Sequence, residues 1–332
     1  MKSGKVSEAV LKRSILKTVN KQEKQHMVSK AAVGSDAGMF ACEEMTGVMA
    51  ASSTTLSGCE KGLAAVALKR ACNSLAAAGG NPVAVTVQLV LPETAEEKEI
   101  KELMQETLAA CEVSGVAFAS GHTQISSFVA EPVISVTAMG SASAVMTLEE
   151  TVYGSDLVMT KAAGLAGAAL LAGHYRENLH ERYTYAFIDK AAAREAEVSI
   201  QPEIKVLKEL GIRHMHDVAE GGVFGAVWEL CERLSAGVEL ELKKIPICQE
   251  TVEICEYFDV NPYQLKGDGA LLFLTHDSAA AIKALKEAGI PAAVIGRVNE
   301  SNDRVLINED ETRFLEPNRV DEYEKARKFE RK

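Results

Sequence analysis

The sequence His214-Met215-His216-Asp217-Val218-Ala219-Glu220-Gly221-Gly222-Val223 places two imidazoles, two carboxylates and a glycine pair directly before an amphipathic helix. After it, apolar residues recur at steps of three and four, at Val223, Val227, Leu230, Cys231 and Leu234. This period predicts a core-facing helix, whose N-terminus would favour an anion. Taken alone, residues 214–223, the signature segment, fit a functional site and a helix start capped by Asp217 and Glu220 equally well.

Length and composition indicate a globular protein with two domains. The chain has 332 residues, 47% of them hydrophobic, which is enough for two separate cores. Apolar runs such as Val83–Leu91 are too short to cross a bilayer, and Lys2 and Lys5 lead to charged residues instead of an apolar signal core. The seven cysteines form no CxxC pair, which favours reduced thiols. We therefore expect a cytoplasmic protein that does not enter the membrane.

The charge balance argues against binding to nucleic acid or to anionic lipid. The formal net charge is −11, whereas phosphate contacts need clustered Lys and Arg. Basic residues gather only near the two ends, where acids and polar residues separate them. Solvated helix faces account for that pattern, and no nucleic-acid partner is expected.

Helix and strand patterns alternate through the first half of the chain. Leu63–Ala78 has the helical period and ends at Gly79-Gly80-Asn81-Pro82, where the chain reverses. Val83–Leu91 alternates apolar with smaller or polar residues, as a strand does. The pattern also predicts helices at Ser7–Val19 and Glu96–Cys111, strands at Gly115–Ala119 and Val133–Met139, and a strand end before Gly121-His122-Thr123.

An acidic, turn-rich stretch at Leu148–Gly154 interrupts these patterns, so we expect a first domain at residues 1–150 and a second at residues 151–332. The second half again mixes strands and helices. Its expected strands are Leu157–Thr160, Val238–Leu242, Ala270–Thr275, Ala293–Val298 and Val305–Asn308, and its helices Gly164–Leu171, Gln201–Leu210, the signature helix and Ser278–Ala288. Each half is therefore α+β in class.

Several segments in a fixed order carry a family resemblance. They are the signature segment, Gly34-Ser35-Asp36-Ala37-Gly38, residues 69–82, Gly121-His122-Thr123, residues 159–167 and residues 261–272. In this order the chain resembles the aminoimidazole ribonucleotide (AIR) synthase superfamily, and within it the relatives of the hydrogenase maturation protein HypE. Any one segment would be weak, but together they are specific.

The resemblance implies a fold, a cofactor and a partner. It implies two α+β domains, with the N-terminal domains of two chains pairing in a β-barrel-like dimer interface and an α/β sandwich as C-terminal domain. Members use ATP to phosphorylate an amide-like or acid oxygen of the substrate, with magnesium held by acidic residues. The candidate ATP-binding residues are Asp36, Asn73, Gly121, His122, Thr123, Lys161, Gly221 and Gly222, and Asp36 is the candidate metal ligand.

The acidic residues of the family pattern are depleted in this chain. Ser35 stands at the first Asp of the family's Gly-Asp-Asp-Ala loop, Ser53 (or Ser52) at the Asp that closes a strand, and Ser74 at the Asp of Asn-Asp. Gln124 and Ala166 replace glutamates of close relatives. Because hydroxyls do not compensate the charge of Mg²⁺, Asp36 alone would make a poor magnesium site. The ATP and magnesium motifs are therefore degenerate.

The cysteines argue against carbamoyl dehydration on the protein's own tail. HypE members end in a cysteine that accepts a carbamoyl group, whereas this sequence ends Phe329-Glu330-Arg331-Lys332 and its last cysteine is Cys255.

The candidate catalytic residues are Asp217, Glu220 and His216. The two carboxylates have the chemistry of an acid and a base, or of groups that orient a substrate, and His216 would assist them. Packing is an alternative for His216, a tight loop for Gly221 and Gly222, a turn for His122 and Thr123, and a solvent-facing position for Lys161. Two functions remain open: an ATP-utilising enzyme, and a pseudoenzyme that retains only a binding or scaffold role.

Overall fold

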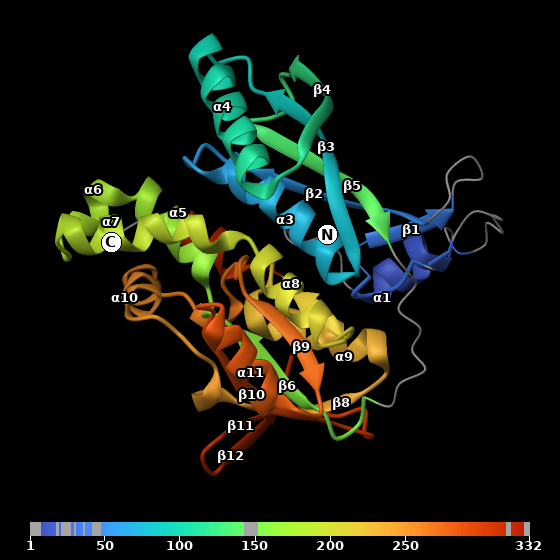
Figure 1. The fold of residues 1–332 in the computed structure, drawn as a ribbon. Coiled ribbons are helices and arrows are strands. Elements are labelled where there is room, and N and C mark those ends of the chain that lie inside the picture. The colour runs from blue at the N-terminus through green and yellow to red at the C-terminus, as the bar shows by residue number, and fades with distance from the viewer. Residues whose placement is uncertain are drawn as a thin grey trace. The chain divides into compact units, whose positions relative to one another are not determined.

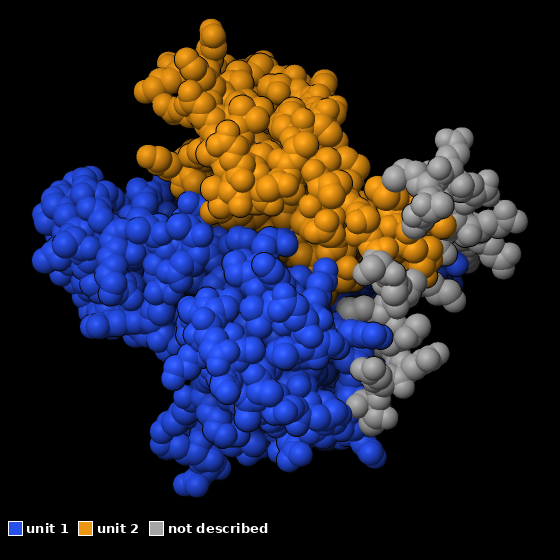
Figure 2. Space-filling model, viewed as in Figure 1, with its two compact units in different colours: residues 1–24, 30–35, 146–332 blue, residues 25–29, 36–145 orange. Residues whose placement is uncertain are grey.

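The computed structural model describes residues 8–17, 20, 28–29, 31–35, 37–41, 48–142, 152–316 and 320–328. The chain divides into two compact units (Figure 2): unit 1 comprises residues 1–24, 30–35 and 146–332, and unit 2 comprises residues 25–29 and 36–145. Each unit is a sheet with helices, so the predicted α+β class is confirmed. The boundary near residue 150 stays a prediction.

Unit 2 is a five-stranded sheet in the order β1-β2-β5-β3-β4 (Figure 1). Its strands are β1 Ala37–Ala41, β2 Val48–Ser57, β3 Gly80–Leu91, β4 Ala117–Ile125 and β5 Val133–Ala142, all antiparallel to their neighbours except β3 and β4. Helix α3 (Leu63–Ala77) is buried along its whole length and packs on β5 and β2. Helix α4 (Glu97–Ser114) packs on α3.

One face of this sheet carries rows of hydroxyl groups. The strand register aligns Ser53, Thr137, Thr86 and Ser120 across β2, β5, β3 and β4. The Ser53 and Thr137 hydroxyl oxygens lie 2.8 Å apart, as do those of Thr55 and Ser135 in the next row. Alternate residues on the same strands, such as Val85 and Ala138, are fully buried. The sheet thus has an apolar face and an uncharged, hydroxyl-bearing face.

Strand β4 corrects one sequence-based prediction. Gly121, His122 and Thr123 lie inside β4, not after a strand end. Almost every residue of this edge strand is exposed, so it lacks the alternation of buried apolar residues that identified β3. The alternative that placed His122 and Thr123 in a turn was therefore wrong.

Unit 1 is a seven-stranded sheet in the order β12-β11-β8-β10-β6-β9-β7. Its strands are β6 Asp156–Thr160, β7 Met215–Asp217, β8 Gly237–Glu241, β9 Leu271–Thr275, β10 Ala292–Asn299, β11 Arg304–Asn308 and β12 Glu311–Phe314, antiparallel except β8 with β11. Its core includes the fully buried Leu157, Leu272 and Val223. The predicted strands are confirmed with small shifts at their ends.

The helices of unit 1 include the signature helix α9 (Gly222–Leu234) and the nearly fully buried α5 (Leu165–His174). The others are α1 Glu8–Val10, continued by a π-helical stretch at Leu11–Leu16, α6 Arg176–His180, α7 Tyr185–Ala193, α8 Gln201–Glu209, α10 Gln249–Phe258, α11 Ser278–Glu287 and α12 Glu322–Ala326, with short 3₁₀ turns at Arg194–Val198, Leu242–Lys244 and Pro262–Gln264. No helix among the described residues is long and apolar enough to span a bilayer.

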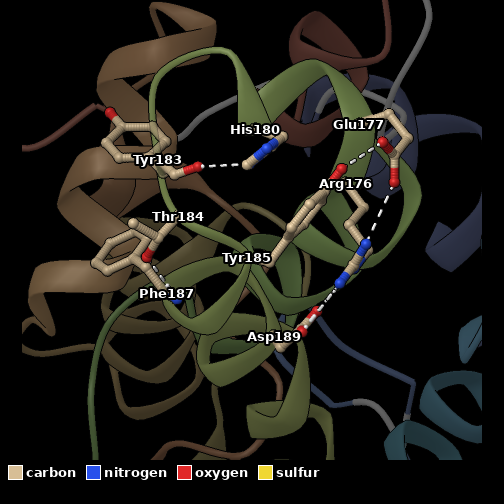
Figure 3. A network of polar contacts seen from close by, with 8 residues as sticks. All are labelled: Arg176, Glu177, His180, Tyr183, Thr184, Tyr185, Phe187 and Asp189. Carbon is tan, nitrogen blue, oxygen red and sulfur yellow. Dashed lines mark hydrogen bonds and ion pairs between the residues drawn. The ribbon is translucent and has the colours of Figure 1, made fainter.

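A polar and aromatic network joins α6 to α7 (Figure 3). Arg176 makes a bidentate ion pair with Asp189, at 2.7 and 3.0 Å, and its guanidinium lies 4.1 Å from the ring centroid of Tyr185. The His180 ring stacks on Tyr185 at 3.6 Å. The Tyr185 hydroxyl donates to Glu177 at 2.8 Å. Because these groups satisfy one another, the network fixes two short helices that would be marginal alone.

Candidate functional site

The signature segment runs from β7 through a short loop into α9. From His214 to Val227 every residue is buried except Ala219 and Glu220, which are partly exposed. His216 and Asp217 are 3% and 5% exposed. Glu220 is therefore the one carboxylate that this otherwise buried stretch presents to solvent.

Helix α9 begins without a side-chain cap. Its N-cap residue is Gly221, which has no side chain, so Asp217 and Glu220 do not occupy the N-cap and N3 positions that a capping pair requires. That alternative for the signature segment was wrong. The two carboxylates thus do not form the capping box of α9.

Both loop glycines have left-handed backbone conformations, φ +86° at Gly221 and φ +63° at Gly222. A Cβ on Gly222 would lie 2.6 Å from the Tyr263 carbonyl oxygen and 2.7 Å from that of Leu265. A Cβ on Gly221 would meet nothing closer than Gly225 Cα at 3.6 Å. Gly222 therefore serves close backbone packing, whereas Gly221 requires glycine through its φ alone.

A carboxylate from the far end of the chain completes this loop. Asp321 Oδ2 accepts the Gly221 N–H at 2.6 Å, and Oδ1 accepts the N–H groups of Lys266 at 3.1 Å and Tyr323 at 2.8 Å. Burial raises the pKa of Asp321 to about 6, against the opposing effects of the Lys266 charge and of the Gly221 and Tyr323 amides. Glu220 adds to the rise.

Asp321 belongs to a C-terminal segment, residues 320–328, that packs on residues 261–268. The neighbouring Glu322 accepts the Asn261 N–H at 3.2 Å, and the Lys266 ammonium lies 4.1 Å from the ring centroid of fully buried Tyr323. The sequence analysis missed Asp321. Its one local signal is an Asp directly before the acidic start of a short helix, which α12 uses as its N-cap.

His216 is held by a carboxylate from α9. Its Nε2 lies 3.3 Å from Glu229 Oε2, and Glu229 is 21% exposed. Thirteen positions separate the two residues, so no motif links them in the sequence. The pair places His216 against the signature helix.

Lys161 is an internal structural residue. Its ammonium donates to the carbonyl oxygens of Glu197 at 2.9 Å and Ser199 at 2.7 Å, and pairs with fully buried Glu203 at 2.7 Å. Its side chain is 11% exposed, so the solvent-facing alternative was wrong. Desolvation raises the pKa of Glu203, with Lys161 acting in the opposite direction. Lys161 therefore has its acceptors without a phosphate.

In unit 2, polar residues follow one another along buried α3. Lys69, Arg70 and Asn73 are 4%, 5% and 1% exposed, and Ser74 is 9% exposed. All four take part in polar or electrostatic contacts. Burying two cations on one helical turn is costly unless anionic or polar partners meet them, and these contacts supply such partners.

The β4 residues are arranged differently. Gly121 and Thr123 lie on the side of the sheet that bears its apolar rows, and His122 lies on the hydroxyl-bearing side, 3.3 Å from Gln124. Gly121 is required there because a Cβ would come 2.8 Å from the Val87 carbonyl oxygen. His122 and Thr123 therefore point away from each other.

The described residues do not fit a magnesium site. Asp36 lies outside them, and among them no group of three or more His, Cys, Asp or Glu side chains is placed to hold a metal ion. The hydroxyl of Ser53, one of the two positions at which the sequence analysis expects a family carboxylate to be replaced, is paired with Thr137. Paired neutral hydroxyls do not compensate a divalent charge.

A cavity of about 410 Å³ lies at the N-terminus of α3, lined by Glu60, Lys61, Glu99 and Glu106 among others. Glu106 accepts the Gly62 N–H there at 3.0 Å and so caps α3 from α4. None of the residues predicted to act in catalysis or ATP binding lines this cavity.

Comparisons with known proteins agree with this fold. The N-terminal domain of the AIR synthase related protein family matches residues 34–142, and its C-terminal domain matches residues 153–308. A putative hydrogenase expression/formation protein of Methanocaldococcus jannaschii is 23% identical over 252 residues, 73% of this chain and 72% of the relative.

The carbamoyl dehydratase HypE of Rhodobacter capsulatus is 24% identical over 233 residues, 68% of this chain and 66% of the relative. The crystal structure of HypE in complex with ATP superposes with a TM-score of 0.67 at 15% identity, covering 97% of both chains. The matched domains span most of the sequence in the expected order. The chain is therefore a HypE-like member of the AIR synthase related protein family.

Proposed function

We propose that this protein binds ATP and uses it to activate an amide, carbonyl or carboxylate group of a substrate held beside Asp217 and Glu220. The observation that carries the proposal is the partial exposure of Glu220 in a loop whose other residues, apart from Ala219, are buried and whose Gly221 amide is held by Asp321. The accessibility of Glu220 suits a group that meets a ligand.

The two carboxylates would take different roles. Glu220, partly exposed, would exchange a proton with the reacting group of the substrate. Asp217, 5% exposed at the end of β7, would orient that group and not exchange protons with solvent. His216, held by Glu229, would fix the strand that carries Asp217.

The nucleotide phosphates would be met by α3. Lys69, Arg70 and Asn73 lie within about one helical turn, so their polar ends can serve one anionic group. ATP supplies the phosphoryl group that turns the substrate oxygen into a leaving group. The solved complex of HypE with ATP supports the nucleotide, and no step is assigned to magnesium because the described residues do not fit it.

The substrate would be a separate molecule and not one of the deeply buried cysteines of this chain. Cys72, Cys231 and Cys255 are buried, and burial raises the pKa of each thiol to about 12. Such thiols are not nucleophilic at neutral pH. We propose that the protein acts in the cytoplasm.

We further propose a homodimer formed through unit 2. The hydroxyl-bearing face of its sheet and the edge strand β4 remain exposed in the single chain, and Ile125 and Phe128 beside that edge are 52% and 96% exposed. An exposed edge and apolar side chains favour association with a second chain.

A binding or scaffold protein without nucleotide chemistry is the second candidate. Two contacts favour it: the Ser53 hydroxyl is paired with Thr137, and the Lys161 ammonium is paired with Glu203. Both side chains therefore have hydrogen-bonding or ionic partners within the chain and need no ligand. Under this alternative the partly exposed Glu220 would contact a partner protein.

Calorimetry of the full chain with ATP, with and without Mg²⁺, separates the two candidates. A dissociation constant for ATP near the micromolar range, which corresponds to a binding free energy of about −8 kcal/mol, supports the first candidate. Arg70→Met should then weaken ATP binding. Glu220→Gln should abolish turnover of an identified substrate while leaving ATP binding intact. Glu209→Gln, on the exposed end of α8, is the matched control. No binding at millimolar ATP would select the scaffold.

A further inference from the structure

The helical stretch Glu8–Leu16, here named the N-terminal helix, touches the signature helix α9 through polar groups. The Trp228 indole N–H donates to Glu8 Oε2 at 3.0 Å. Lys12 pairs with Glu8 at 2.6 Å and also with Glu232 on α9. Two side chains of the N-terminal helix therefore meet two side chains of α9.

The two α9 residues that meet the N-terminal helix are also held together by Arg304. Arg304 donates to Glu232 Oε2 at 2.8 Å, and its guanidinium lies 4.1 Å from the ring centroid of Trp228. Arg304 is 8% exposed. Lys12 and Arg304 together hold the pKa of Glu232 below its ordinary value, with the Lys12 hydrogen bond the largest cause.

The N-terminal helix buries none of its residues. Ile15 is 44% exposed, and Lys12, the residue that links it to two carboxylates, is 49% exposed. Exposed ion pairs contribute little to stability and are screened by salt. Its apolar residues Val10, Leu11 and Leu16 are only partly buried, so the ion pairs carry much of the attachment to α9, and this attachment depends on ionic strength.

A second point of attachment follows along the chain at Gly34. Its φ is +72°, and a Cβ there would lie 2.3 Å from the Glu229 carbonyl oxygen. Glu229 is the residue whose carboxylate holds His216. The segment that ends in Gly34 is therefore seated on α9 by close backbone contact, which only glycine allows.

We infer that the N-terminal helix is a salt-sensitive strap that docks on and leaves α9, and that its docking is coupled to the seating of Gly34 beside Glu229. The strap ties the chain just before Ser35 to the helix that carries the signature loop. This inference does not depend on ATP binding.

The sole tryptophan of the sequence, Trp228, reports the docked state. In the ligand-free full chain, raising NaCl from about 10 mM to about 1 M shortens the Debye length from about 30 to about 3 Å. We expect acrylamide quenching of Trp228 to rise at least twofold as the strap leaves, with a red shift of the emission maximum.

Charge reversal tests the same contact without salt. Lys12→Glu should show the high-salt quenching already at low salt, because it repels both Glu8 and Glu232. Lys17→Glu makes the same charge change at the residue that directly follows the N-terminal helix, where no ion pair to α9 occurs among the described residues, and should behave like the unchanged protein. Equal quenching in both variants and no salt effect would overturn the strap.

The coupling to Gly34 is tested separately. Gly34→Ala should raise Trp228 quenching, although the substituted residue does not touch the indole. Gly38→Ala is the matched control, since a Cβ at Gly38 meets nothing within 4 Å. If Gly34→Ala leaves the quenching unchanged while Lys12→Glu raises it, the strap stands but its coupling to Gly34 is refuted.

Discussion

The Gly221 N–H donates to the Asp321 carboxylate at 2.6 Å, across 100 positions of the sequence. The same carboxylate accepts the Lys266 N–H, so one side chain joins two loops that the sequence separates. The C-terminal family domain ends at residue 308. The loop that carries the family signature is therefore completed by a residue outside the matched domain.

Removing this carboxylate should destabilise the protein. Asp321→Ala leaves the buried N–H groups of Gly221 and Lys266 without their acceptor, a loss of about 1 to 3 kcal/mol in the free energy of unfolding. Denaturant unfolding measures the loss, and hydrogen exchange at Gly221 should accelerate. Asp310→Ala, at an exposed turn, should change neither. Unchanged exchange at Gly221 would show that Asp321 does not hold the loop.

Stability should depend on pH through Asp321. Its pKa is raised from 3.8 to about 6 in the folded protein by burial, so the folded state binds the proton more tightly than the unfolded state. The resulting stabilisation is complete below about pH 4 and is lost as the pH rises through about 6, a change of about 3 kcal/mol. Unfolding free energies of the wild type and Asp321→Asn, compared from pH 4 to 7.5, isolate this effect. If the free energy of unfolding of the wild type, taken relative to that of Asp321→Asn, does not fall from pH 4 to 7.5, the raised pKa of Asp321 is contradicted.

The two signature glycines should tolerate substitution differently. Gly222→Ala combines a left-handed backbone with a Cβ placed 2.6 Å from the Tyr263 carbonyl oxygen, and should lower the free energy of unfolding by about 3 kcal/mol. Gly221→Ala meets only the backbone cost, about 1 kcal/mol. Thermal unfolding of both variants gives the comparison. Equal losses would mean that the Tyr263 contact does not constrain the loop.

The buried pair of Lys161 and Glu203 should behave as one unit. Lys161→Met leaves the fully buried Glu203 carboxylate without its cation, and we expect a loss of about 3 to 5 kcal/mol. Combining it with Glu203→Leu should recover much of that loss, as a double-mutant cycle would measure. ATP affinity should not change in the double variant, because Lys161 is already satisfied. Additive losses would argue against a direct pair.

The proposed dimer can be disrupted from the hydroxyl-bearing face. Thr137→Asp introduces a charge beside Ser53 in the middle of that face, and two copies facing each other would repel. Light scattering should show a dimer for the wild type and a monomer for the variant. Gln105→Asp, on the exposed side of α4, should leave the dimer intact. A monomeric wild type would refute the dimer itself.

Periodic segments with buried apolar residues could be predicted from the sequence closely. Helix α3 was expected at Leu63–Ala78 and occupies Leu63–Ala77, and α8 and α11 agree within one residue at their C-terminal ends. In each case the burial of regularly spaced side chains determines the element. Strand β7 escaped prediction because it has three residues, too few for any period.

The site could be predicted only where its residues are neighbours in the sequence. Asp217, Glu220 and the glycine pair are recognisable from their spacing, but Asp321, Glu229 and Glu203 act through contacts that folding alone creates. Lys161 shows the reverse case. Because it lies beside a glycine-rich turn, it has the sequence context of a phosphate ligand. In the structure its ammonium instead forms an ion pair with Glu203, 42 positions away.

The bond between Gly221 and Asp321 also sets an order of events during synthesis. Strands β7 and β9 and helix α9 precede residues 320–328 in the chain, so they leave the ribosome while the acceptor of the Gly221 amide is still being made. The signature loop can reach its final hydrogen bonding only after residue 321 has emerged. A nascent chain therefore contains the signature segment well before that segment can adopt its final, hydrogen-bonded conformation.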